Sequence, residues 1–100
     1  MLTENEKTFI LKITRKSNFT CEELNFNLTA EENGLYDCCC WECWSDAKDL
    51  AKEHGYNVNV VKGLLGSLTK KGYIAIEDAT ECGDEVLINK DRFEKIKADL

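Results

Sequence analysis

The stretch that decides the fold is residues 45–76, which read SDAKDLAKEHGYNVNVVKGLLGSLTKKGYIAI. Apolar residues recur here at helical three- and four-residue spacings on both sides of Gly55, which is predicted to end the first of two helices. The second helix is predicted from Asn57 or Asn59 to Lys71, and its buried face from Val58, Val61, Leu64, Leu65 and Leu68. Gly72 ends this helix, and a strand is predicted to follow.

Two short alternating runs, Tyr73–Glu77 and Val86–Asn89, flank a loop rich in Asp, Glu and Gly. This arrangement predicts an antiparallel hairpin. Asp91 is expected to cap a last helix that carries Phe93, Ile96 and Leu100 on one face. This face is a candidate for the interface of a homodimer.

Upstream, Thr3 and Glu6 have capping-box spacing and predict the start of a first helix whose apolar face is Phe9, Ile10 and Ile13. The same spacing at Thr20/Glu23 and at Thr29/Glu32 predicts two short helical turns. The helix that ends at Gly55 is predicted to begin near Asp37, or later, near Ser45, because a run of Cys and Trp is a poor helix former. The chain is therefore expected to be one domain, residues 1–100, mainly α with a small β hairpin (α+β), with an acidic insertion containing Cys and Trp at about 17–44.

Residues 45–76 resemble the helix-turn-helix and first wing strand of winged-helix transcription regulators, including small phage and bacterial proteins of unassigned function. The resemblance rests on the packing residues Ala47, Leu50 and Ala51, on the turn at Gly55, and on the exit KKGYI at 70–74. It implies a helix laid in the major groove of double-stranded DNA, as in a sequence-specific regulator. The residues it would use for contact are Asn57, Asn59, Lys62, Ser67, Lys70 and Lys71.

Charge argues partly against that role. The net charge is -6, residues 17–47 hold seven acidic residues and no Lys or Arg, and the loop 77–85 holds five acidic residues and no basic one. Phosphates would be repelled by such a wing. Gly63 and Gly66 stand where such helices often carry Lys or Arg, which suggests close packing against that face. The alternative is a protein-interaction module, such as a phage-encoded inhibitor, that binds a basic host protein.

Six cysteines include one C-x-x-C, at Cys40 and Cys43, but no second pair that would complete a zinc site. We therefore predict no metal site and no cofactor, with several cysteines and both Trp41 and Trp44 in the core, and with Cys82 exposed in the wing loop. No catalytic triad, phosphate-binding loop or zinc-protease motif is present, so the chain is not expected to be an enzyme. With no signal peptide and no apolar run of membrane-spanning length, it is expected to be cytoplasmic.

Overall fold

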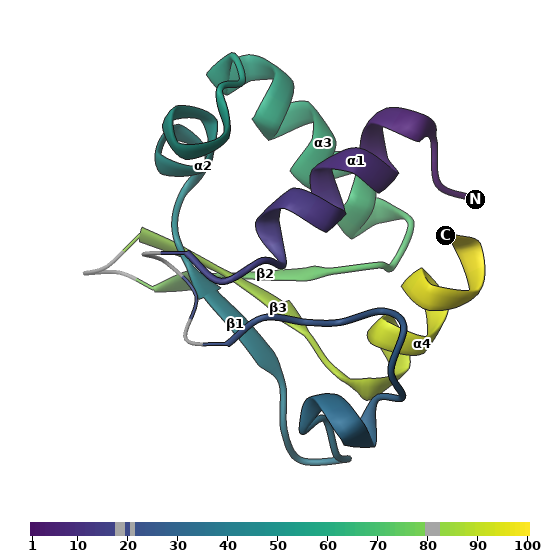
Figure 1. Ribbon diagram of the computed structural model, residues 1–100. Coiled ribbons are helices and arrows are strands. Elements are labelled where there is room, and N and C mark those ends of the chain that lie inside the picture. The colour runs from purple at the N-terminus through teal and green to yellow at the C-terminus, as the bar shows by residue number, and fades with distance from the viewer. Residues whose placement is uncertain (18–19, 21, 80–82) are drawn as a thin grey trace.

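The computed structural model describes residues 1–17, 20, 22–79 and 83–100. Over these residues the chain is an α+β fold of four α-helices, one 3-10 helix and a three-stranded antiparallel sheet, and α1, α2 and α3 gather on one side of the sheet (Figure 1). The expected α+β class is therefore confirmed. The elements follow one another as α1 (Glu4–Ile13), η1 (Glu31–Asn33), β1 (Trp41–Trp44), α2 (Ala47–His54), α3 (Val58–Lys70), β2 (Ala75–Ala79), β3 (Gly83–Ile88) and α4 (Lys90–Asp99).

Local capping signals set the ends of the first three helices. In α1 the backbone N–H of Glu6 donates to Thr3 Oγ1 at 3.1 Å, and that of Thr3 donates to Glu6 Oε1 at 2.8 Å, as the capping box predicted. Gly55 ends α2 at φ 74°, and Gly72 follows α3 at φ 83°. Residues that carry a side chain rarely adopt such positive φ angles, so glycine at these two positions lets the chain turn sharply without strain.

The sheet has the strand order β1-β3-β2, and both strand pairs are antiparallel. Val86, on the central strand, lies opposite Cys43 on one side and Ile76 on the other. Val86, Cys43 and Ile88 are fully buried, so this face of the sheet packs on the helices. The predicted hairpin of β2 and β3 is confirmed. The sequence did not predict the additional strand β1, which pairs with the other edge of β3.

Strand β1 occupies residues that were predicted to belong to a long helix beginning near Asp37. Its burial alternates, with Trp41 and Cys43 inside and Glu42 and Trp44 outside, as a strand with one solvent face requires. The helix begins only at Ala47, after Asp46, whose side chain accepts a hydrogen bond from the Asp49 N–H at 2.9 Å. The later start near Ser45 was therefore the correct alternative.

The segment 17–44 is an integral part of the core, since it contributes the buried Leu24, Ala30 and Leu35 in addition to β1. Its second predicted turn is confirmed, because Thr29 and Glu32 form the reciprocal box, at 3.1 Å in both directions, at the start of η1. Its first predicted turn is wrong. Thr20 instead pairs as an isolated bridge with Cys43, and its hydroxyl bonds back to the end of the α1 segment.

The last helix, α4, begins two residues earlier than predicted. Asn89, rather than Asp91, caps it by accepting a hydrogen bond from the Arg92 N–H at 2.8 Å. Phe93 and Ile96 are fully buried in the protomer core, and Phe93 stacks on Phe26 with 5.0 Å between the ring centroids. The prediction that these two residues form a dimer interface is therefore wrong; of the three residues proposed for it, only Leu100 is exposed.

Candidate nucleic-acid interface

Helices α2 and α3 are joined by a short turn that has a helix cap on each side. Gly55 reverses the chain after α2, and Asn57 then caps α3 by accepting a hydrogen bond from the Asn59 N–H at 2.8 Å. Val61, Leu65 and Leu68 bury one face of α3 against the core, as predicted. The opposite face of α3 is therefore fixed in direction and open to solvent.

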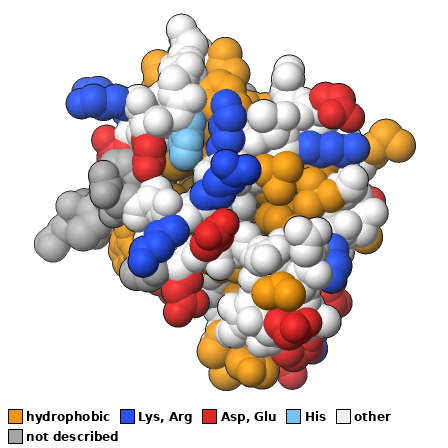
Figure 2. Space-filling view, viewed as in Figure 1, with side chains coloured by type: hydrophobic (Ala, Val, Ile, Leu, Met, Phe, Trp, Pro, Cys, Tyr) orange, Lys and Arg blue, Asp and Glu red, His pale blue; other side chains and the backbone are white. Residues whose placement is uncertain are grey.

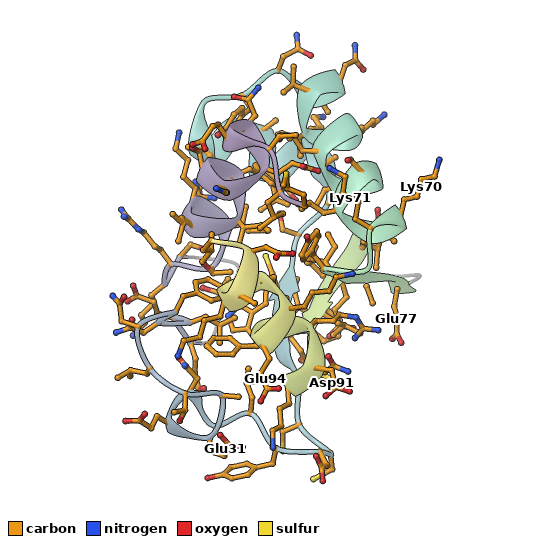
Figure 3. The ribbon with its side chains drawn as sticks, turned by 90° about the vertical axis from the view of Figure 1, so that its right-hand side faces the viewer. Glu31, Lys70, Lys71, Glu77, Asp91 and Glu94 are labelled. Atoms are coloured by element: carbon orange, nitrogen blue, oxygen red, sulfur yellow. The ribbon has the colours of Figure 1, made fainter. Side chains whose placement is uncertain are left out.

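Four of the six predicted contact residues lie on exposed parts of this unit, namely Asn57, Asn59, Lys62 and Lys70. Lys70 projects away from the body of the molecule at the end of α3 (Figure 3). The side-chain oxygen of Asn57 is already used as the cap of α3. The group that α3 presents for contact is therefore best described as Asn59, Lys62 and Lys70.

The other two, Ser67 and Lys71, turn towards α1 instead. The Ser67 hydroxyl donates to Glu6 Oε2 at 2.7 Å, and Lys71 Nζ lies 2.7 Å from Glu6 Oε1. A second bond joins Lys71 Nζ to the Met1 carbonyl at 3.2 Å. Both side chains thus bind a carboxylate that is 3% exposed, unlike the other four residues of the predicted contact set.

The Glu6 carboxylate is the strongest electrostatic feature of the helical unit. Burial alone would raise its pKa, but hydrogen bonds from Lys71, Thr3 and Ser67 outweigh burial and lower the pKa from 4.5 to about 2. In the sequence, Glu6 is recognisable only as half of the capping box with Thr3. Nothing local in the sequence indicates that Ser67 and Lys71, which follow Glu6 by 61 and 65 positions, would bind the same carboxylate.

The outer face of α3 between Lys62 and Lys70 has two positions without a side chain. Gly63 and Gly66 are exposed, and a Cβ built at either position would meet no atom within 4 Å. The expectation that something packs close to this face is therefore not met within the chain itself. The bare backbone leaves room for an external surface to approach.

The turn end of the β2–β3 hairpin lies beside the starts of α2 and α3. An open cavity of about 440 Å³ is lined by Asp84 of β3, by Lys62 and Val58 of α3, and by the first residues of α2, including Lys48. Lys48 was absent from the predicted set, although its place two residues after the Asp46 cap indicates an exposed position. This arrangement puts one carboxylate of the acidic hairpin next to two lysines.

The outer face of the sheet carries a second charged feature. Glu85 lies opposite Trp44 on one neighbouring strand and opposite Glu77 on the other. It is 8% exposed, and its pKa is raised first by burial and then by the carboxylates of Glu42 and Glu77. Trp44 is 42% exposed, so its predicted place in the core is wrong; Trp41 is buried as predicted, and its indole N–H donates to the Glu22 carbonyl at 2.8 Å.

Charge is divided between two parts of the chain. Residues 1–16 and 46–73, which form α1, α2 and α3, hold nine basic and five acidic residues, a formal charge of +4. The remaining residues hold four basic and fourteen acidic ones, a formal charge of -10. In Figure 2 the Lys and Arg side chains lie mostly over the helical part in the upper half, whereas Asp and Glu predominate below.

Three of the four cysteines that the structure describes lie outside the core. Cys38, Cys39 and Cys40 are exposed, whereas Cys43 is fully buried, and burial raises its pKa to about 12. The prediction of several core cysteines therefore holds only for Cys43 among those described. Cys40 and Cys43 differ in burial and do not share a site. The predicted exposure of Cys82 falls outside the described residues.

No family model, no curated protein and no solved structure matches this chain. Among the described residues, no helix has both the length and the apolar character that crossing a bilayer requires.

Proposed function

We propose that the chain is a winged-helix domain that binds double-stranded DNA through the outer face of α3, as a sequence-specific transcription regulator does. The α+β architecture, with helices α2 and α3 followed by the β2–β3 hairpin, is compatible with that fold. The observation that carries the proposal is the division of charge, because the helical part is positive although the whole chain is negative. A positive helical face can approach phosphates although the chain as a whole is acidic and Asp84 of the hairpin lies beside Lys48 and Lys62.

In this proposal the exposed residues Asn59, Lys62 and Lys70 of α3 make the contacts with DNA. The Asn59 amide can pair with the edge of an adenine, since it offers one donor and one acceptor. Lys62, one turn after Asn59, and Lys70, at the end of α3, contact phosphates, which positions the helix without reading sequence. Gly63 and Gly66 let the helix backbone lie close to the groove. Lys48, beside Lys62 in the cavity near the hairpin, extends the positive surface onto α2.

The test is a titration with duplex DNA at several salt concentrations. The logarithm of the binding constant should fall linearly with the logarithm of salt concentration, with a slope of about -0.9 per neutralised phosphate. Lys62→Ala and Lys70→Ala should each reduce the slope by about 1. Lys97→Ala, an exposed lysine on α4, is the matched control and should leave the slope unchanged. Absence of binding even at low salt would exclude this function.

The outer face of the sheet favours a second candidate function, binding of a basic protein. There Glu85 is buried beside the carboxylates of Glu42 and Glu77, and the exposed Trp44 lies directly opposite it. A Lys or Arg side chain of a partner would neutralise these carboxylates and stack on the indole. The basic partner and the DNA would occupy different faces of the molecule.

The two functions are distinguished by removing charge from the sheet face. Glu42→Gln together with Glu77→Gln should abolish capture of a basic partner and leave the DNA titration unchanged. Glu94→Gln, on the exposed face of α4, is the control for general loss of acidity. If the double variant and the wild type recover the same proteins from a cell extract, the sheet face is not the contact surface.

A further inference from the structure

A tight turn between η1 and β1 brings two thiols together. The Cys39 N–H donates to the Tyr36 carbonyl at 3.0 Å and closes the turn. Within it the Sγ atoms of Cys38 and Cys39 lie 3.8 Å apart, and both residues are exposed. Because they are neighbours in the chain, this proximity is a property of the turn itself and does not depend on distant parts of the fold.

Buried anchors hold the turn on both sides. Before it, Leu35 is 3% exposed, and its N–H donates to the Ala30 carbonyl at 2.9 Å. After it, Trp41 is 4% exposed and is tied by its indole N–H to the Glu22 carbonyl. The thiols therefore sit on a supported loop, which reduces the conformational entropy that a ligand would have to remove.

The separation of the two sulfur atoms fits metal coordination. With Zn–S bonds of about 2.3 Å, two ligands of a tetrahedral site are about 3.8 Å apart, and the observed separation is 3.8 Å. Thiolates select soft ions such as Cu(I) and Zn(II). The surrounding segment 17–47, which holds seven acidic residues and no Lys or Arg, attracts cations.

No group of three or more His, Cys, Asp and Glu side chains is arranged to hold a metal ion in the part of the chain that the structure describes. An ion at Cys38 and Cys39 would consequently have two protein ligands and take the rest of its coordination from solution. This pair also differs from the C-x-x-C of the sequence, whose Cys43 is buried in the core.

We propose that Cys38 and Cys39 form a two-thiolate site that binds a thiophilic metal ion or metalloid. Binding exchanges the two thiol protons for two bonds from sulfur to the ion, without change of oxidation state. With phenylarsine oxide, a trivalent arsenical, two As–S bonds form, and the arsenic-bound oxygen leaves as water with the two thiol protons. This reagent is therefore a direct probe of two thiols at this separation.

The experiment treats the reduced full-length chain with phenylarsine oxide and counts adducts by intact mass. The wild type should carry one phenylarsenic group at this site that dimercaptopropanol removes and that an equal thiol concentration of a monothiol does not. Cys38→Ser and Cys39→Ser should each lose this monothiol-resistant adduct. Cys40→Ser, an exposed thiol next in the chain, is the matched control and should retain it.

Three outcomes would overturn the proposal: no resistant adduct on the wild type, an unchanged adduct on either serine variant at 38 or 39, or its loss from the control variant at 40. Circular dichroism of each variant establishes that the fold is retained. Parallel titrations with Zn(II), Cd(II) and Cu(I), followed by ligand-to-metal absorbance, show which ion the pair takes. The absorbance should disappear in the Cys38→Ser/Cys39→Ser double variant for any ion that binds there.

Discussion

The carboxylate of Glu6 ties α1 to the end of α3, and neutralising it tests how much this link stabilises the fold. Glu6→Gln keeps the size of the side chain and an oxygen that can accept from the Thr3 N–H. It removes the charge that Lys71 contacts at 2.7 Å. It also removes the Oε2 acceptor to which the Ser67 hydroxyl donates. We therefore expect a loss of stability that depends on pH.

The magnitude follows from the pKa of Glu6, which is lowered from 4.5 to about 2. At about 1.4 kcal/mol per pKa unit, this difference corresponds to at most about 3.5 kcal/mol. Lys71 is 35% exposed, so solvent screens the pair, and we expect about 1–2 kcal/mol. Because folding lowers this pKa, the stabilisation is complete above pH 4.5 and is lost as the pH falls towards 2.

Urea unfolding of wild type and Glu6→Gln, at neutral pH and at a series of values down to about pH 2, measures this difference. Glu4→Gln is the matched control, since Glu4 lies in the same turn with a 91% exposed side chain and pairs with Lys7 at 3.6 Å. It should cost no more than about 0.5 kcal/mol at any pH. A Glu6→Gln variant as stable as wild type at neutral pH, or a difference that persists unchanged at about pH 2, would refute the reasoning.

Four further substitutions test the backbone and the core by thermal or urea unfolding. Gly63→Ala and Gly66→Ala should each stabilise α3 by about 1 kcal/mol, because the added methyl group meets no atom; unchanged or lower stability would contradict this. Gly72→Ala should destabilise by about 1–2 kcal/mol, since φ is 83° there and the new Cβ would lie 3.2 Å from Lys95 Nζ. Trp41→Phe should cost about 1–3 kcal/mol through the lost indole hydrogen bond, and a neutral result would show that this bond is dispensable.

The elements that the sequence predicted correctly are those whose signals are local. The box at Thr3 and Glu6 and the glycines at 55 and 72 each act within one turn, so their residue types are sufficient evidence. The strand β1 was missed because its pairing is non-local and because Cys40, Cys43 and Trp44 also fit helical spacing. Its alternating burial is visible only once the partner strand is known.

The candidate site was predicted in part for the same reason. A helical projection correctly put Asn59, Lys62 and Lys70 on the outer face of α3. The same projection could not show that Ser67 and Lys71 are taken up by Glu6, because that carboxylate comes from another helix far back in the chain. A buried charge recruits partners by three-dimensional proximity, which spacing along one helix does not reveal.

The position of β1 at the edge of the sheet bears on the order in which the molecule folds. Strands β2 and β3 form a local hairpin, whereas the partners of β1 in β3 come 41 to 47 residues later in the chain. Closing so long a loop is slow, so the hairpin should form first and β1 should dock late. Until it docks, β3 has an unpaired edge that a second chain can use, and refolding yield should fall as protein concentration rises.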